Sequence, residues 1–455
     1  MNIIIAGCGK VGYALAQQLN DEGHDITIID NSAPRLQPVL SALDVQGMVG
    51  NATNFHALQE AGVEDADLLI AVTNQDEINM LSCLIAKKSG KCQTIARVRN
   101  PEYFQEISYL KQCLDISLAI NPEFAAAKEI AHLIQVPDAM EIDSFAKGRV
   151  DLLRVAISEN SPLHSMTVQA FSKRFNHEIL ICTLEHEHQV SIPNGNSVLR
   201  AGDTISVIMP KEKINSFYKT TKLASTREIH DVILAGGGTV SYYLTQMLLQ
   251  SGIHVTILEK DRERCDFLSL ALPDATIIHA DATDHKILLE EGLASADAFV
   301  ALTNMDEENV FLSLFANKIN PKCKKITKMN RLALSEIAED LPIGSTISPK
   351  HITTEHILQY VRSYGNSYGS NNVEALYRLL DNQVEALEFH IGESCSVTNI
   401  PLLQLKLKKN LLICCIVRNN RIITPSGRDS IQLNDTVIVV TTHKGLQDIS
   451  DILEN

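Results

Sequence analysis

The chain has 455 residues, of which 45% are hydrophobic and 21% are charged. That balance is typical of soluble globular domains, and the length predicts two to four of them, each with its own core. The 40 basic and 55 acidic residues give a formal net charge of −15. A field of that sign repels phosphate backbones and anionic lipid headgroups, so it excludes nucleic acid as the main partner.

The sequence gives no sign of export or membrane insertion. It contains no run of about 18 consecutive apolar residues, the length that a spanning helix needs. Residues 1–7 also lack the basic region of a signal peptide. Ten cysteines without a C-x-x-C pair are ordinary for this length. We therefore expect a cytosolic protein whose cysteines are reduced and mostly buried.

A glycine-rich turn follows the first apolar strand, expected over residues 3–6, and leads into an amphipathic helix. It has the G-x-G-x-x-G spacing, with glycines at Gly7, Gly9 and Gly12. In a strand–turn–helix unit the first glycine allows the tight turn and the second lets the backbone approach a diphosphate, while the third lets the helix pack on the strand. The helix N-terminus then presents N–H groups to the anion. This context favours a nucleotide site over a purely structural turn.

An acidic residue ends the next apolar strand. Asp30 lies near the spacing of about 20 residues at which a carboxylate binds ribose hydroxyls in dinucleotide folds. Because a carboxylate repels a 2′-phosphate, NAD(H) or an adenine nucleotide is favoured there over NADP.

Polar residues follow two later strands. Thr73 and Asn74 come directly after the apolar run 69–72, at the edge of a parallel sheet where ligands bind. Either residue equally fits a helix cap, since a helix is expected from about Asp76. Arg97 ends the run 94–96 and is a weaker candidate for a phosphate contact, because it equally suits a solvated surface.

The second half of the chain repeats the first, about 230 residues further along. The strand and turn at 3–12 recur at 232–241, and the strand that ends in Asp30 recurs as one that ends in Glu259. Another motif repeats too, with turn residues and a Gly/Asn-Asp-Thr sequence at 192–205 and 424–437. Collinear matches of this length indicate that a whole two-part unit is duplicated.

These patterns predict an α/β protein. It has two Rossmann-like doubly wound parallel-sheet domains, each followed by a small α+β domain, in tandem duplication. The polar segment 211–230 is expected to be the main linker, and the Gly/Ser/Asn stretch 365–372 a second one. A helix over 122–134 is expected to lead across the first internal boundary. The four expected domains are 1–135, 136–220, 229–365 and 372–455.

The second glycine turn departs from the pattern. Ser241 replaces the third glycine, so close packing of the helix is expected to be slightly compromised. Glu259 replaces the aspartate and keeps the carboxylate for ribose. We therefore hypothesise that the two sites differ in affinity or in ligand.

Three kinds of chemistry are not indicated. No G-x-x-x-x-G-K-[ST] motif is present, so ATP hydrolysis is not expected. No evident proton-relay residue accompanies the nucleotide folds, so we predict no catalytic residue. His177, His186 and His188 lie near an expected hairpin, but they lack a further ligand at metal spacing, so we predict no metal site.

The motifs AGCGKVG, IID, GNAT, AVTN-x-DE-x-NM and ARVRNPEY together resemble the cytoplasmic nucleotide-binding subunit of bacterial and archaeal Trk potassium-uptake systems, over essentially the whole chain. The halves resemble RCK units, the regulators of potassium conductance. The resemblance implies a regulatory subunit that binds NAD(H) and ATP or ADP and gates a membrane-embedded potassium transporter. It further implies a homotetrameric ring of eight RCK units at the inner face of the cytoplasmic membrane.

By position, the resemblance also implies cofactor-binding residues in both halves, with Lys10 at the terminal phosphate. Thr239 at the Lys10 position and Lys328 at the Arg97 position argue against identical ligands. The implied residues are Gly7, Cys8, Gly9, Lys10, Val11, Gly12, Asp30, Thr73, Asn74 and Arg97 in the first half, and Gly236, Gly237, Gly238, Thr239, Val240, Glu259, Thr303 and Asn304 in the second.

Two other functions fit part of the pattern. An NAD-dependent oxidoreductase would use the same glycine turns, but it needs a substrate pocket, and here the extra length goes to a second nucleotide fold and two small domains. An RCK-type regulator of another channel or transporter would share every binding residue. Co-purification with the membrane partner would separate that alternative from the first.

Overall fold

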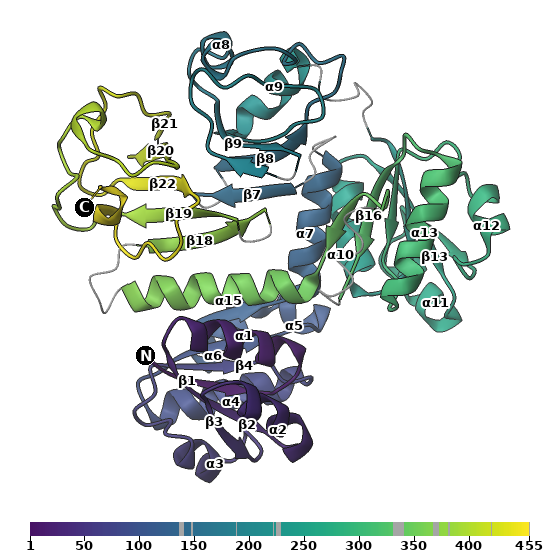
Figure 1. Cartoon of the computed structure of the whole chain (residues 1–455). Helices are drawn as coiled ribbons and strands as arrows, with labels where there is room; N and C mark the ends of the chain where they lie inside the picture. Colours follow the sequence, from purple (N-terminus) through teal and green to yellow (C-terminus); the bar gives the residue numbers. More distant parts are fainter. Residues whose placement is uncertain are drawn as a thin grey trace.

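The structure is a computed structural model. It describes residues 1–135, 141–146, 149–187, 189–221, 223, 229–330, 341–366, 373–380, 383–419 and 421–454. This part of the chain forms two parallel sheets flanked by helices and two smaller antiparallel sheets (Figure 1). The parallel-sheet domains lie at the bottom and right of Figure 1, and the small domains lie side by side above the long helix α15 (Pro349–Asn366).

The first parallel sheet has the strand order β3-β2-β1-β4-β5-β6, which is the Rossmann order. Its central strands are short and apolar because helices cover both faces, with one buried cluster around Ile5 and Ile70 and another around Ile4 and Leu69. The strands are β1 (Asn2–Ala6), β2 (Asp25–Asp30), β3 (Gln46–Val49), β4 (Leu68–Ala71), β5 (Gln93–Arg97) and β6 (Leu118–Ile120), and the helices are α1 (Lys10–Asp21), α2 (Ala33–Ala42), α3 (Phe55–Glu60), α4 (Asp76–Ser89), α5 (Pro101–Gln105), α6 (Ile107–Leu114) and α7 (Pro122–Gln135).

The second parallel sheet, ordered β14-β13-β12-β15-β16-β17, reproduces the first. Its register also repeats, since Ile5 pairs with Ile28 and Leu234 pairs with Ile257. Among the described residues the strands are β12 (Asp231–Ala235), β13 (His254–Glu259), β14 (Thr276–His279), β15 (Ala298–Ala301), β16 (Lys324–Lys328) and β17 (Ser345–Ile347), and the helices besides α15 are α10 (Thr239–Gln250), α11 (Arg262–Ala271), α12 (His285–Glu290) and α13 (Asp306–Ile319).

The small domains are antiparallel sheets ordered β10-β9-β11-β8-β7 and β18-β19-β22-β20-β21, which correspond strand for strand when the first order is read backwards. The first contains β7 (Glu141–Phe145), β8 (Val150–Ala156), α8 (Val168–Arg174), β9 (Leu180–His186), β10 (Gln189–Ser191), β11 (Thr204–Pro210), η1 (Lys211–Lys213) and α9 (Ile214–Thr221), and the second contains β18 (Val373–Leu379), β19 (Val384–His390), η2 (Leu402–Gln404), β20 (Leu411–Arg418), β21 (Arg421–Ile423), β22 (Thr436–Thr441) and η3 (Ile449–Ile452).

The repeated Asp-Thr motif closes a turn in each small domain. Asp203 accepts a hydrogen bond from the backbone N–H of Arg200 at 2.7 Å, and Asp435 accepts the equivalent bond from Gln432 at 2.7 Å. Both aspartates are buried. A buried carboxylate needs such donors, which accounts for the motif.

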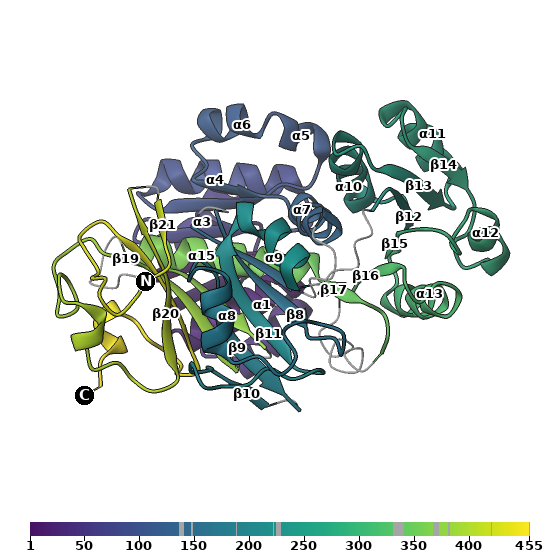
Figure 2. The same ribbon diagram turned by 90° about the horizontal axis from the view of Figure 1, so that it is seen from above.

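The two halves exchange their last parallel-sheet helices. Helix α7 of the first half packs on α10 of the second, where Ile130 and Ile134 join a core with Leu244. Helix α15 of the second half packs on α1 of the first, where Leu358 joins a core with Leu15. Both views show α7 and α15 at the junction between the two parallel-sheet domains (Figures 1 and 2). Each parallel-sheet domain therefore completes its core with a helix from the other half.

The small domains share a buried core as well. Their inner sheet faces meet, and Phe145 packs on Tyr377 with ring centroids 4.4 Å apart. We call this cluster the joint core. It contains Phe145, Ala146, Val150, Leu152, Cys182, Ile208, Leu379, Leu380, Val384, Ala386, Cys414, Cys415, Val417, Ile438 and Val440.

The prediction that residues 211–230 form a linker is wrong for residues 211–221. Residues 211–221 form η1 and α9, and Phe217 and Tyr218 of α9 are buried in the core of the first small domain. Their apolar spacing is too short to stand out in a polar segment, yet it is enough to cover one sheet face. Of the second expected linker, residues 367–372 lie outside the described residues. The expected crossing helix is confirmed as α7.

Candidate functional site

The first glycine turn is built for close backbone approach. Gly7 has a φ of +104°, and a Cβ there would lie 2.9 Å from the Thr73 nitrogen. A Cβ on Gly12 would lie 1.9 Å from the Gly7 carbonyl oxygen, so the helix needs glycine at that position. Gly9 has open space around its Cα and is the N-cap of α1, which has no side-chain cap. The turn therefore leaves the N-terminus of α1 accessible to an anion.

Asp30, at the end of β2, forms hydrogen bonds that hold this turn in place. One carboxylate oxygen accepts the backbone N–H of Cys8 at 2.7 Å, and the other accepts that of Ser32 at 2.9 Å. The side chain is buried, with 6% of the residue exposed. Each oxygen keeps a further lone pair, so Asp30 suits a ribose hydroxyl while it also orders the loop. Burial raises the pKa of the neighbouring Cys8 thiol, and Asp30 adds to that effect.

The second turn has the same shape with different chemistry. Gly236 has a φ of +103°, and the hydroxyl of the fully buried Ser241 donates to its carbonyl oxygen. Ser241 therefore forms a hydrogen bond at the position where Gly12 of the first half approaches the backbone closely, and the expected loss of close packing stays a prediction. The carboxylate of Glu259 accepts the Gly237 N–H at 2.7 Å, and Arg264 donates to the Gly237 carbonyl at 2.7 Å.

A cavity of about 130 Å³ lies beside this second turn. Its lining joins the turn to the ends of three strands, as expected for a nucleotide site at the carboxyl edge of a parallel sheet. The lining residues that the sequence pointed to are Gly236, Gly238, Glu259, Thr303 and Asn304, and the cavity adds Leu258, Lys260, Ala280, Asp281, Ala282, Thr283, Leu302, Met305 and Glu308.

Thr73 is tied to a buried asparagine that sequence reasoning did not single out. Asn79 on α4 accepts the Thr73 hydroxyl at 2.7 Å and the Thr73 N–H at 2.8 Å, and it donates to the Arg97 carbonyl at 2.9 Å. Asn309 repeats this pattern with the Thr303 N–H at 2.8 Å and the Lys328 carbonyl at 2.9 Å. The N-cap of α4 is Gln75, so neither Thr73 nor Asn74 occupies the cap position.

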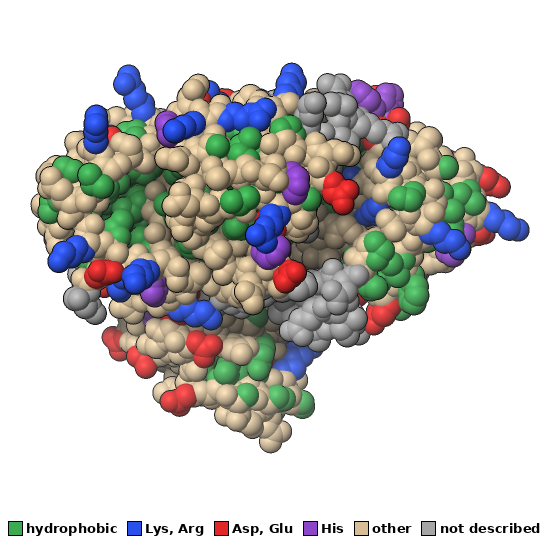
Figure 3. Space-filling model, turned by 45° about the horizontal axis from the view of Figure 1, so that its top comes forward, with side chains coloured by type: hydrophobic (Ala, Val, Ile, Leu, Met, Phe, Trp, Pro, Cys, Tyr) green, Lys and Arg blue, Asp and Glu red, His purple; other side chains and the backbone are tan. Residues whose placement is uncertain are grey.

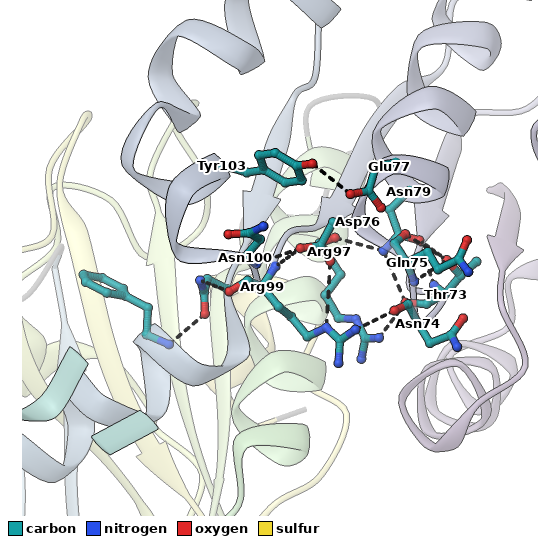
Figure 4. A network of polar contacts seen from close by, with 12 residues as sticks. Thr73, Asn74, Gln75, Asp76, Glu77, Asn79, Arg97, Arg99, Asn100 and Tyr103 are labelled. Atoms are coloured by element: carbon teal, nitrogen blue, oxygen red, sulfur yellow. Dashed lines mark hydrogen bonds and ion pairs between the residues drawn. The ribbon is translucent and has the colours of Figure 1, made fainter. Parts of the chain in front are cut away.

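Two arginines close the turn that follows β4. The guanidinium of Arg97 donates to the Thr73 carbonyl at 2.5 Å, and that of Arg99 donates to the Asn74 carbonyl at 2.5 Å (Figure 4). Asp76 accepts the backbone N–H groups of Arg99 and Asn100, both at 2.7 Å. The loops after β4 and β5 are therefore held together. Arg99 and Asp76 lie within the motifs ARVRNPEY and AVTN-x-DE-x-NM, but the sequence alone does not show that the loops after β4 and β5 meet, so neither residue was selected.

A larger cavity, of about 280 Å³, lies between the two parallel-sheet domains. We call it the interdomain cavity. Val11 of α1 and Gly238 of the second glycine turn line it, as do the first turns of the exchanged helices. The first half contributes Val11, Arg97, Arg99, Pro122 and Glu123, and the second contributes Gly238, Thr239, Val240, Leu302, Asn304, Lys328, Asn330, Pro349, Lys350 and Thr353.

Several basic side chains line the interdomain cavity, and burial disfavours their charged forms. Burial lowers the pKa of Arg97, and the nearby Arg99 adds to this. Burial likewise lowers the pKa of Lys328. Burial raises the pKa of Glu123, the carboxylate in the lining, although both arginines oppose that shift. Arg97 Nε and Glu123 Oε2 are buried without a hydrogen-bond partner within the described part of the chain. Such a lining favours an anion.

The structure also describes Lys10, Asn74 and His186, which the sequence analysis had singled out. Lys10 is exposed in the first turn of α1, and Asn74 is exposed at the sheet edge. Of the histidines, His186 pairs with Asp203 at 2.6 Å, and His188 lies outside the described residues. No group of three His, Cys, Asp or Glu able to hold a metal occurs among the residues that the structure describes. Within those same ranges no helix combines the length and the apolar character needed to cross a bilayer.

The fold and these sites define a tandem protein of two Rossmann-type nucleotide folds, each followed by a small antiparallel domain. The family model of the TrkA-N domain matches residues 3–122 and 232–349, and that of the TrkA-C domain matches 152–222 and 386–454. The chain therefore belongs to the TrkA family of Trk system potassium uptake proteins. The predicted resemblance is confirmed.

Relatives match over almost their whole length. The Trk system potassium uptake protein TrkA homolog of Archaeoglobus fulgidus is 31% identical over 452 residues, which cover 99% of this chain and 100% of the relative. The TrkA protein of Vibrio alginolyticus is 30% identical over 98% of this chain and 96% of its own length.

Solved structures share the fold at low sequence identity. The GsuK channel superposes with a TM-score of 0.65 at 14% identity, covering 97% of this chain and 77% of the channel chain. The GsuK channel bound to NAD gives 0.64, with the same identity and coverage. These matches confirm the predicted fold class.

Proposed function

We propose that this protein is a regulatory, non-catalytic subunit of a potassium uptake system. In this proposal it binds NAD(H) and ATP or ADP and couples the ligand state to gating of a membrane-embedded Trk-type transporter subunit. The observation that carries the proposal is the interdomain cavity, because residues at the N-termini of α1 and α10 and residues of both exchanged helices line it. A ligand there contacts both halves, so its binding favours one relative arrangement of the domains over others.

Acidic residues and basic residues at different places in the site indicate the chemistry of the ligand. Asp30 and Glu259 suit ribose hydroxyls. The N-termini of α1 and α10 and the cations Arg97, Arg99 and Lys328 suit phosphates that point into the interdomain cavity. Lys10 and Thr239 occupy the same place in the two halves, so we propose that the sites differ in ligand.

The first experiment is calorimetric titration of the full-length protein with NADH, NAD, NADPH, ATP and ADP. We expect Asp30→Ala to weaken NADH or adenine-nucleotide binding at least tenfold. The matched control is Asp67→Ala, because Asp67 also accepts a backbone N–H, that of Asn2 at 2.8 Å, but at the opposite edge of the same sheet. Equal affinity in both variants would refute the assignment of Asp30 to the ligand.

A second titration tests the basic side chains that line the interdomain cavity. Arg99→Gln should weaken ATP binding more than ADP binding, because the longer phosphate chain reaches further into the cavity. Lys88→Gln, which removes an equal charge from an exposed position at the end of α4, is the control. Equal losses for ATP and ADP would contradict the proposed orientation.

The oxidoreductase alternative remains testable with the same preparation. Steady oxidation of NADH with any small-molecule acceptor would support it. The proposed regulator binds nucleotide without turnover and changes potassium uptake when it is reconstituted with its transporter subunit. If it instead co-purifies with a different channel, the RCK-type alternative is favoured.

For the assembly we propose a homotetramer with eight repeat units, located in the cytoplasm at the inner face of the membrane. Repeat-equivalent apolar residues support such self-association, since Leu81 on α4 is 46% exposed and Phe311 on α13 is 70% exposed. Light scattering should give a tetramer mass that Phe311→Asp reduces. Leu270→Asp on α11, at a position 86% exposed, is the control.

A further inference from the structure

Two repeat-equivalent cysteines meet inside the joint core of the small domains. Cys182 lies on β9 and Cys414 lies on β20, and their Sγ atoms are 3.3 Å apart. Each thiol also contacts the carbonyl two residues earlier, Leu180 at 4.0 Å and Leu412 at 3.4 Å. A residue meets its own equivalent only at the two-fold axis of an isologous contact. The pair therefore marks the pseudo-two-fold axis between the halves.

The pair has no part in the proposed nucleotide function. Both glycine turns and the interdomain cavity belong to the parallel-sheet domains, whereas Cys182 and Cys414 lie between the small-domain sheets. The two residues are 232 positions apart in the chain, so a bond between them would join the two halves covalently.

We propose that Cys182 and Cys414 form a redox-active thiol pair, which a small-molecule disulfide oxidises to a bond between the two small domains. One thiol, as its thiolate, attacks the small disulfide, giving a mixed disulfide and releasing one small thiol. The second protein thiolate then attacks the protein sulfur of the mixed disulfide and releases the other small thiol. In total two protein thiols lose two electrons and two protons, and the small disulfide gains them.

Access to the joint core sets the rate of this reaction. Cys182 and Cys414 are 0% and 1% exposed, and burial raises the pKa of Cys414 well above its usual range. Burial also raises the pKa of the neighbouring Cys415 to about 12. Because the thiolate is the reactive form, the closed core protects the pair.

The rim of the joint core is less closed. Val190, Ile192, Leu412 and Ile422 pack against the core but are only partly buried. Figure 3 shows apolar side chains gathered in a hollow between the two small domains. We therefore expect oxidation to follow transient separation of the small domains, after which the bond holds them together.

The test uses the full-length protein and oxidised glutathione. Free thiols are alkylated in denaturant at successive times, and the products are mapped by peptide mass spectrometry. The expected product is an intramolecular Cys182–Cys414 disulfide that dithiothreitol reverses and that raises the midpoint of thermal unfolding. Cys182→Ser and Cys414→Ser should form at least tenfold less intramolecular cross-link.

Cys415→Ser is the matched control, because this cysteine is similarly buried in the same core and adjacent to Cys414, whereas the Sγ atom that lies 3.3 Å from that of Cys182 belongs to Cys414. It should retain the cross-link. If a serine variant misfolds, the map of the wild-type protein decides the question. The proposal is overturned if both thiols stay free after the exposed Cys113 has been glutathionylated, or if another pair such as Cys83 and Cys92 is joined instead.

Discussion

Arg362 of the second half forms an ion pair with Glu22 of the first, with 2.6 Å between Nη2 and Oε1. The guanidinium also donates to the Leu376 carbonyl of β18 at 3.2 Å. One side chain on α15 thus connects α1, on the first parallel-sheet domain, with the second small domain. The exchanged helix is fixed by charge at this end and by apolar packing along its length.

Removing this arginine should destabilise the contact between the halves. The side chains of Arg362 and Glu22 are only 10% and 22% exposed, so Arg362→Ala leaves a largely buried carboxylate unpaired. We expect a loss of about 2 kcal/mol in the free energy of unfolding, measured by urea denaturation.

The matched control for that loss is Lys213→Ala, which breaks the exposed pair of Lys213 with Glu178 at 2.8 Å. An exposed pair contributes about 0.5 kcal/mol. Equal losses in the two variants would show that Arg362 does not hold the halves together.

Substitutions at two glycines of the first turn should have different effects, one on folding and the other on nucleotide binding. Gly12→Ala places a methyl group against the Gly7 carbonyl, where only backbone movement relieves the clash, and should cost about 3 kcal/mol of stability. Gly9→Ala meets nothing within 4 Å and has a φ of −78°, so it should fold normally. Its methyl group occupies the space through which a diphosphate approaches, so nucleotide affinity should fall at least tenfold in calorimetry. Normal binding by a well-folded Gly9→Ala protein would place the diphosphate elsewhere.

Much of this architecture follows from local patterns. The glycine turns, the acidic strand ends and the duplication are all visible in the sequence, because each depends on a short run of residues. Thr73 and Asn74 were correctly placed at the sheet edge, but the role of Thr73 depends on Asn79, six residues later. That spacing recurs between Thr303 and Asn309, which is a signal that comparison of the halves offers.

Other features need tertiary contacts that no local pattern encodes. The apolar stripes of α7 and α15 predict that each helix is half buried, but they do not say which half of the chain buries it. The same holds for Phe217 and Tyr218, whose burial makes residues 211–221 part of a domain rather than a linker. The division into 1–135, 136–220, 229–365 and 372–455 stays a prediction.

The buried amide of Asn79 should be a large contributor to local stability. Asn79→Ala leaves the Thr73 N–H and the Arg97 carbonyl without this partner inside the protein, and each lost bond of this kind costs about 1–3 kcal/mol. We expect a total loss of about 3 kcal/mol in urea denaturation, with weaker nucleotide binding because the loop after β4 is released. Asn51→Ala is the control, since exposed Asn51 accepts only local bonds from Thr53. A loss below 1 kcal/mol for Asn79→Ala would show that water replaces the amide.

His24, in the turn between α1 and β2, should make the protein less stable at mildly acidic pH. Burial lowers its pKa, with the amino terminus and Arg362 adding to the shift and Glu22 and Asp25 opposing it. In the unfolded chain a histidine titrates near pH 6.5, at about its ordinary pKa. Below that pH the unfolded state binds the proton more readily than the folded state, and this lowers the free energy of unfolding. The folded state therefore keeps its full stability above pH 6.5 and loses part of it as the pH falls toward the lowered pKa of His24.

Urea denaturation at pH 7.5 and pH 5.5 checks the sign of this effect. The wild-type protein should lose more free energy of unfolding between the two pH values than His24→Gln does, because glutamine takes up no proton. His56→Gln, at an exposed position on α3, controls for the removal of one histidine. If both variants change the pH dependence equally, His24 has no special part in it. A larger loss in His24→Gln than in the wild type would mean that protonated His24 stabilises the fold through Glu22 and Asp25.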